Sequence, residues 1–230
     1  MKQSRRDLVA ELVNELQPVK RPGRIAHMVL LWLVLSWTYT VLVVSATGAW
    51  RPGAAAQLAA SPQFLAESLL GLAAGISLVV AGLRLGIPDP AHALERSALP
   101  LFLAAAWACC YLLGLISPAL DPSMLGKRQH CWLETLIYAM PPLLAGLLLL
   151  RHLLPLHPAT SGALMGLAAG ALPALAMQFA CMYDPAHALS YHLAPTLAVA
   201  GVGAAIAPWL LARHSRSRPP ASSVAKPGEG

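Results

Sequence analysis

Charged residues are scarce in this chain of 230 residues. Asp, Glu, Lys and Arg make up only 11% of it, while 57% of the residues are hydrophobic. Ordinary soluble domains carry about a quarter charged residues. The shortage of charge argues against a soluble globular protein and predicts an all-α, polytopic membrane protein.

Recognisable catalytic motifs are also missing. The chain has no Gly-x4-Gly-Lys-Ser/Thr phosphate loop, no His-Glu-x2-His zinc motif and no Gly-x-Ser-x-Gly nucleophile motif. A Cys-x2-Cys pair is absent as well. We therefore expect no enzyme activity and no required cofactor.

Apolar runs of about 20 residues, the length that crosses a bilayer as a helix, occur six times. No acid or base lies in the middle of any run, which weakens the alternative that the chain is a small transporter or channel, since such proteins mark their path with buried ionisable groups. The predicted domain of six transmembrane helices covers residues 25–212. Its spans are 25–47, 64–86, 98–117, 132–151, 159–182 and 189–212.

The basic residues are distributed unevenly about these spans. Of the 16 Lys and Arg residues, all but Arg51, Lys127 and Arg128 fall at the termini or beside the two loops on the same side as the termini. The positive-inside rule then places both termini in the cytoplasm. We interpret the net charge of +6 as a topology signal and an attraction to membrane lipid, without direct nucleic-acid binding.

Residues 1–24 have the pattern of a short amphipathic helix. Ser4 is a helix cap, an apolar stripe runs from Leu8 to Leu16, and Pro18 ends the helix. A helix of about 13 residues is marginal alone in water, and its polar face carries acids, so we favour a protein partner over a lipid surface. Residues 213–230 have the composition of a disordered tail.

Glycines recur at every fourth position in the fifth predicted span, at Gly162, Gly166 and Gly170. Small residues at this spacing let helix backbones approach closely, which drives association in lipid. We read this ladder as packing, and we read Cys109 and Cys110, in the middle of the third span, in the same way.

Two other cysteines, Cys131 and Cys181, flank the hairpin of the fourth and fifth spans. The topology places both at the outer face. Three interpretations stay open: a structural disulfide, a reversible thiol switch, and a site for zinc, cadmium or copper. Further ligands could come from nearby residues, namely His130, Glu134, His187 and His192.

An ordered set of features resembles the NrsF family, the negative regulators of sigma F. It begins with Asp7-Leu-Val-Ala-Glu-Leu12 and Leu16-Gln-Pro-Val-Lys-Arg21, and continues with Cys131-Trp-Leu-Glu134. Pro141, Pro155, Pro158, the glycine ladder, Cys181 and His192 follow in order. The family often has Trp-His where this chain has Tyr191-His192.

The resemblance implies an anti-sigma factor of the bacterial inner membrane. Its cytoplasmic arm would hold an extracytoplasmic-function sigma factor away from RNA polymerase, and its outer cysteine pair would sense metal or oxidative stress. The residues of the arm that would bind the sigma factor are Leu8, Leu12, Val13, Leu16, Pro18 and Val19.

Overall fold

The computed structural model describes residues 13, 25–87, 93–153 and 155–216. Within them the chain is helical, and Ser123 and Tyr183 form an isolated β-bridge. The elements are α2 (Ile25–Thr47), α3 (Ala54–Ala60), α4 (Pro62–Arg84), α5 (Ala93–Gly114), α6 (Cys131–Arg151), α7 (Pro158–Ala180), α8 (Pro185–Ala188), the π-helical turn η1 (Leu189–Leu193) and α9 (Ala194–Arg216).

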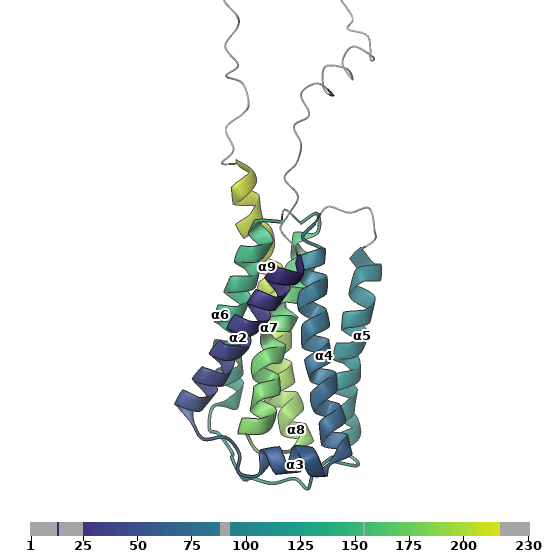
Figure 1. Cartoon of the computed structure of the whole chain (residues 1–230), viewed down its shortest axis with the longest axis vertical. Helices are drawn as coiled ribbons and strands as arrows, with labels where there is room; N and C mark the ends of the chain where they lie inside the picture. The colour runs from purple at the N-terminus through teal and green to yellow at the C-terminus, as the bar shows by residue number, and fades with distance from the viewer. Residues whose placement is uncertain (1–12, 14–24, 88–92, 154, 217–230) are drawn as a thin grey trace, which may run out of the picture.

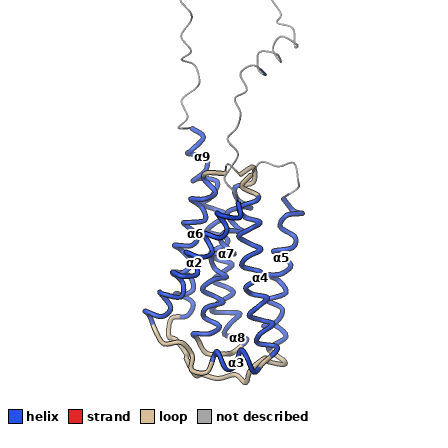
Figure 2. The backbone as a smooth tube through the Cα atoms, in the orientation of Figure 1, coloured by secondary structure: helices blue, strands red, loops and turns tan. Residues whose placement is uncertain are grey.

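In the described part of the chain, six helices are long and apolar enough to cross a membrane, as the sequence predicted. They run side by side as a bundle, with α3 lying across one end, where α8 leads through η1 into α9 (Figure 1). Ile25 starts α2 and Arg216 ends α9 at the opposite end. Most loops among the described residues lie at the end where α3 and α8 are (Figure 2). We call it the cysteine end, because Cys131 and Cys181 lie there.

The predicted boundaries need small corrections. The third helix runs from Ala93 to Gly114, shifted toward the N-terminus relative to the prediction of 98–117. The predicted sixth span is preceded by α8 and begins within η1. The predicted arm lies outside the described residues except for Val13, which is helical and exposed. The predicted tail of residues 213–230 lies outside them from residue 217 onward.

Helix α7 forms the centre of the bundle. Of an 18-residue apolar stretch of α7, 83% is buried inside the bundle, against 28–50% for such stretches of the other spans. The difference arises because α2, α4, α6 and α9 all pack around α7. The glycine ladder faces α9: a Cβ added at Gly166 would lie 2.5 Å from the Val199 carbonyl oxygen. Bulky side chains of α2, α4 and α6 fill the remaining core, among them Trp32, whose Nε1 donates to the Pro142 carbonyl at 3.0 Å.

Candidate functional site

The bundle brings Cys131, Cys181, His187 and His192 together at the cysteine end. Cys131 is the first residue of α6, and Cys181 follows the last turn of α7, its N–H bonded to the Met177 carbonyl at 2.8 Å. Because α6 starts and α7 ends at the same end, residues separated by 50 positions meet. We call these four residues the thiol–imidazole cluster.

The ligand atoms of the cluster are close to one another. The two Sγ atoms are 2.9 Å apart, and the Cys181 Sγ lies 3.4 Å from the His187 Nε2. One sulfur or ring nitrogen from each of the four residues falls within 4.8 Å of the others. Both cysteines are free thiols. The cluster therefore combines two sulfurs and two imidazoles in a single small volume.

The cluster is largely shielded from solvent. Cys131 and His192 are each 2% exposed and Cys181 is fully buried, while His187 is half-buried. Val44, Tyr138 and Met177 belong to the apolar shell around the two cysteines. A dry environment strengthens electrostatic and coordinate interactions. His187 is the one member that reaches toward solvent, so an ion or oxidant would approach past its ring.

A helix cap positions His187, and a π-helical turn positions His192. Asp184 caps α8, its Oδ1 accepting from the backbone N–H groups of Ala186 at 2.9 Å and His187 at 3.4 Å. The chain then makes the π-helical turn η1, which carries His192. Thr135 of α6 donates its hydroxyl to the Tyr191 carbonyl at 3.3 Å and ties this turn to the start of α6. Such turns are rare and often occur at functional sites.

The surroundings of Cys181 favour its thiolate. Hydrogen bonding from Cys131 is the main cause, outweighing the opposing effect of burial, and His187 adds to it; together they lower the pKa of Cys181 well below its usual range. A thiolate is the form of cysteine that reacts with oxidants and binds metals. The lowered pKa of Cys181 therefore favours both its oxidation and its binding of a metal ion.

The cluster fits a soft or borderline metal ion. Two thiolates and two imidazoles form one of the common tetrahedral zinc ligand sets. The Nε2 of His192 is buried and has no hydrogen-bond partner in the described part of the chain, an arrangement that costs free energy unless something binds it. In a tetrahedral zinc site the sulfurs would be about 3.8 Å apart, and in a disulfide about 2.05 Å. The observed 2.9 Å lies between these, so small shifts reach either state.

The comparison with protein families identifies the chain's relatives. A family model described as NrsF, negative regulator of sigma F, matches residues 12–212, which is most of the chain. The chain belongs to the NrsF family. It is therefore a negative regulator of sigma factor activity, and a sigma factor is its class of partner. No curated protein and no solved structure matches the chain.

Two of the predicted ligands in this NrsF-family chain, His130 and Glu134, are not among the four residues whose ligand atoms come together. His130 is exposed and occupies the position before α6. Glu134 pairs with Arg128, with 3.4 Å between its Oε2 and the Arg128 Nη1. Arg128 also donates to the Val44 carbonyl at 3.0 Å, so this pair joins the loop before α6 to the end of α2. A ligand role for His130 or Glu134 stays a prediction.

The sequence analysis missed a buried polar network beside the cluster. Tyr183, two residues after Cys181, donates its hydroxyl to Glu67 of α4 at 3.2 Å. Arg51 donates to the Gln178 carbonyl at 3.2 Å, and its guanidinium lies 5.7 Å from the Tyr183 ring centre. Glu67 is 1% exposed and Arg51 3%. These residues are too widely spaced in the chain for sequence to predict that they meet. The signal that could have indicated a polar site is Glu67, a charged residue inside an apolar run.

Charges in this network and in the cluster influence each other. Burial lowers the pKa of the Arg51 guanidinium, and the nearby Cys181 sulfur opposes that shift. Burial and then the Glu67 charge raise the pKa of Tyr183, so its hydroxyl stays protonated and donates to Glu67. Replacing the Cys181 thiolate by a neutral disulfide would remove a negative charge that interacts electrostatically with Arg51. The network therefore links the cluster to α4, through Arg51 and Tyr183 to Glu67.

Proposed function

We propose that this chain is an inner-membrane anti-sigma factor that holds an extracytoplasmic-function sigma factor with residues 1–24. It would release the factor when metal or oxidative stress acts on Cys131 and Cys181. Family membership supports the sigma factor as partner. The observation that carries the sensing role is the buried thiol–imidazole cluster with its 2.9 Å Sγ–Sγ distance.

The two proposed stimuli act on the same atoms. In oxidation, the Cys131 thiol loses its proton, and it and the Cys181 thiolate pass two electrons to a thiol oxidant as an Sγ–Sγ bond forms. In metal binding, zinc, cadmium or copper would be held by both sulfurs and the two imidazoles, and protons would be released as the thiols ionise. Either event changes the Sγ–Sγ distance and so repositions the start of α6 against the end of α7.

The arm supplies the partner-binding element of the proposal. Leu8, Leu12, Val13 and Leu16 would insert as one apolar stripe into a groove on the sigma factor, a common mode of helix recognition. Pro18 and Val19 would follow this helix, and membrane lipid would hold the basic residues beyond them. To release the sigma factor, the sensor must favour a state in which the arm does not bind.

Co-purification of the sigma factor tests the arm. Deleting residues 1–24 or introducing Leu12→Asp should abolish capture of the sigma factor from detergent extracts. Asn14→Asp, which adds the same charge on the polar face, is the matched control and should retain capture. Capture by the deleted chain would refute the role of the arm and leave the sensing proposal standing.

A transcriptional reporter for the sigma factor tests the sensor. Cys131→Ser and Cys181→Ser should each change the reporter's response to cadmium or to a thiol oxidant, because each removes a sulfur from the cluster. Cys109→Ser, at an exposed position in α5, is the matched control and should respond as the natural protein does. An unchanged response in both cluster variants would refute the sensing role.

Metal binding by purified protein separates the two stimuli. His192→Ala should weaken cadmium or zinc binding at least about tenfold, the effect of losing roughly 1.4 kcal/mol of binding free energy. His157→Ala, exposed before α7 at the end opposite the cluster, is the matched control and should leave binding within about twofold. If none of zinc, cadmium and copper binds the reduced natural protein, the metal part of the proposal fails and oxidation is left as the proposed stimulus.

A further inference from the structure

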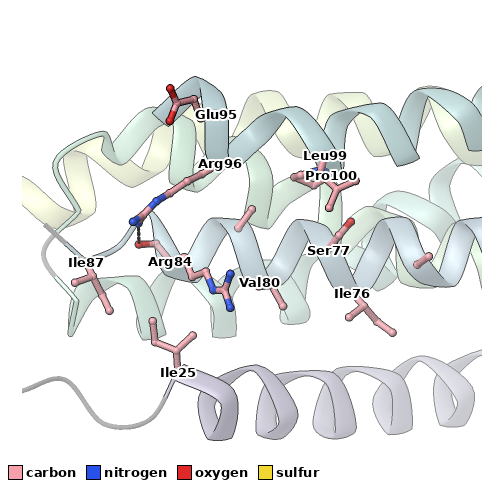
Figure 3. Close-up of a pocket in the computed structure, with 12 residues that line it drawn as sticks. Ile25, Ile76, Ser77, Val80, Arg84, Ile87, Glu95, Arg96, Leu99 and Pro100 are labelled. Atoms are coloured by element: carbon pink, nitrogen blue, oxygen red, sulfur yellow. Dashed lines mark hydrogen bonds between the residues drawn. The ribbon is translucent and has the colours of Figure 1, made fainter. Parts of the chain in front are cut away.

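A groove lies over α4 at the end of the bundle opposite the cysteines, with α2 on one side and α5 on the other (Figure 3). Its volume of about 820 Å³ is within the range of small-molecule sites. Apolar side chains form most of its lining, chiefly Ile25, Ala73, Ile76, Val80, Leu99 and Pro100. The groove is separate from the thiol–imidazole cluster.

The groove extends along the part of α4 that would lie in the membrane. Arg84 is the last residue of α4, and Ala73 lies eleven residues before it. At 1.5 Å per residue these positions are about 16 Å apart, roughly half of a 30 Å hydrocarbon layer. The groove thus begins at headgroup level and reaches the depth of the acyl chains. Its occupant must be apolar along most of its length.

The mouth of the groove is positively charged. Arg84 is exposed and directs its guanidinium into the space between α4 and α2 (Figure 3). Arg96 of α5 reaches toward the same end of α4, where its Nη1 donates to the Arg84 carbonyl at 3.2 Å. Glu95, next to Arg96 in α5, also lines the groove. Two cations and one acid therefore stand at the mouth, which leaves a net positive charge.

A membrane topology signal alone explains arginines at a helix end, because long basic side chains extend there to the interface. It does not explain why Arg84 stands over a groove with apolar walls. An anionic head joined to an apolar chain matches both parts. Basic pockets between helices bind anionic lipid headgroups in this manner.

We propose that the groove binds an anionic phospholipid. Its phosphate would contact Arg84 and Arg96, and an acyl chain would lie along Ile76, Val80 and Leu99. Residues 1–24 are the competing occupant, since they join the bundle at Ile25. Their apolar stripe is accompanied by Glu11 and Glu15, whose carboxylates would have to enter the hydrocarbon layer at a high free-energy cost. The lipid carries no such cost.

Lipid bound here would lie at the root of the arm, because Ile25 lines the groove. The headgroup would therefore help to define how residues 1–24 leave the membrane surface. This role is independent of the thiol–imidazole cluster. It also holds whichever partner residues 1–24 bind.

Native mass spectrometry of the full chain tests the proposal. Micelles would be doped with phosphatidylglycerol or with phosphatidylcholine, and inorganic phosphate would be added in a separate arm. We expect the natural protein to retain phosphatidylglycerol about fivefold better, the factor expected from one basic residue near anionic lipid. Arg84→Gln should remove this preference, and Arg84→Lys should keep it.

A second variant tests the apolar wall without altering charge. Ala73→Trp would fill the groove and should reduce retention of both lipids, while Ala198→Trp adds the same bulk at an exposed position on α9 and should not. Equal retention of the two lipids, or displacement of phosphatidylglycerol by inorganic phosphate, would overturn the proposal. A photo-crosslinker at position 73 should label lipid; labelling of residues 1–24 or of a second copy would also overturn it.

Discussion

The ionisation of Cys181 is governed by its neighbours, because the residue is fully buried. The hydrogen bond from Cys131 is the largest cause of its lowered pKa. Cys131→Ala removes that donor, so the pKa of Cys181 should rise and the thiolate should disappear at neutral pH. Ultraviolet absorbance of the thiolate near 240 nm, followed from pH 5 to 9 in reduced protein, measures this change.

The direction of the pH effect follows from the sign of the shift. A lowered pKa means that the natural protein should keep its thiolate absorbance well below pH 8.5, the usual pKa of cysteine. Cys131→Ser is the matched control, because its hydroxyl can still donate and should preserve most of the shift. An absorbance that titrates near pH 8.5 in the natural protein would contradict the assignment.

Arg128 illustrates how one residue secures the loops at the cysteine end. Its guanidinium donates to the Val44 carbonyl at 3.0 Å, to the Thr47 hydroxyl at 3.2 Å and to the Ala49 carbonyl at 3.3 Å. Arg128→Ala should lower the free energy of unfolding by about 2 kcal/mol, since hydrogen bonds to charged groups contribute about this much.

The neighbouring Lys127 provides the comparison for Arg128. It is exposed, and Lys127→Ala should change the free energy of unfolding by less than about 0.5 kcal/mol. Denaturation in mixed detergent micelles measures both variants. Equal stability of the two would show that the contacts of Arg128 do not contribute.

The residues of the thiol–imidazole cluster were partly predictable. Cys131 and Cys181 flank two consecutive apolar spans, and simple topology brings such positions to one end. His187 and His192 were on the list of further ligands, but so were His130 and Glu134. Sequence distance could not separate these four, because the choice depends on the Asp184 cap, the η1 turn and the pairing of Glu134 with Arg128.

At the scale of elements, the glycine ladder makes the close contact between α7 and α9. A methyl group at Gly166 would lie 2.5 Å from the Val199 carbonyl oxygen, which belongs to the backbone and cannot move aside cheaply. Gly166→Ala should therefore cost about 1–3 kcal/mol of unfolding free energy through overpacking. Thermal unfolding in detergent checks the value.

Gly201 in α9 is the matched control for Gly166. A Cβ at Gly201 would meet nothing within 4 Å. Alanine is the better helix former, so Gly201→Ala should raise stability by about 0.5–1 kcal/mol. Opposite signs for the two substitutions are the expected result. A neutral Gly166→Ala would mean that α7 and α9 do not pack as closely as described.

Hydropathy predicted the long helices well and the short ones not at all. The span predicted at 25–47 matches α2, and the other five differ by a few residues at their ends. Helices α3 and α8 and the turn η1 are too short to show a periodic pattern. Their positions depend on tertiary contacts. For example, Ser61, which joins the end of α3 to the start of α4, donates its hydroxyl to the Ala119 carbonyl of a distant loop at 2.9 Å.

For the whole molecule, the bundle connects the cluster to the arm through helices that run its full length. Cluster residues belong to α6, to the end of α7 and to the segment that leads into α9, and all three helices pack together. A change in the Sγ–Sγ distance would shift the start of α6 against the end of the central helix α7. The far ends of these helices lie near the start of α2, where residues 1–24 join.

This arrangement requires the two ends of the bundle to face opposite sides of a membrane. Only Arg51, Lys127 and Arg128 among the 16 basic residues lie at the cysteine end in the predicted topology, so the positive-inside rule places that end outside. Asp121→Cys, exposed at the cysteine end, should react with a membrane-impermeant maleimide added to spheroplasts. His157→Cys, exposed before α7 at the other end, should react only after the membrane is broken.

The natural cysteines interfere little with this labelling. Cys131 and Cys181 are buried, and Cys109 and Cys110 lie within the apolar helix α5, so the unmodified chain gives the background. The reverse labelling pattern would place the thiol–imidazole cluster in the reducing cytoplasm, where a disulfide switch facing outside stress could not operate. The expected pattern would place the thiols in the compartment from which external metals and oxidants arrive, with residues 1–24, the proposed sigma-binding arm, on the side where a sigma factor acts.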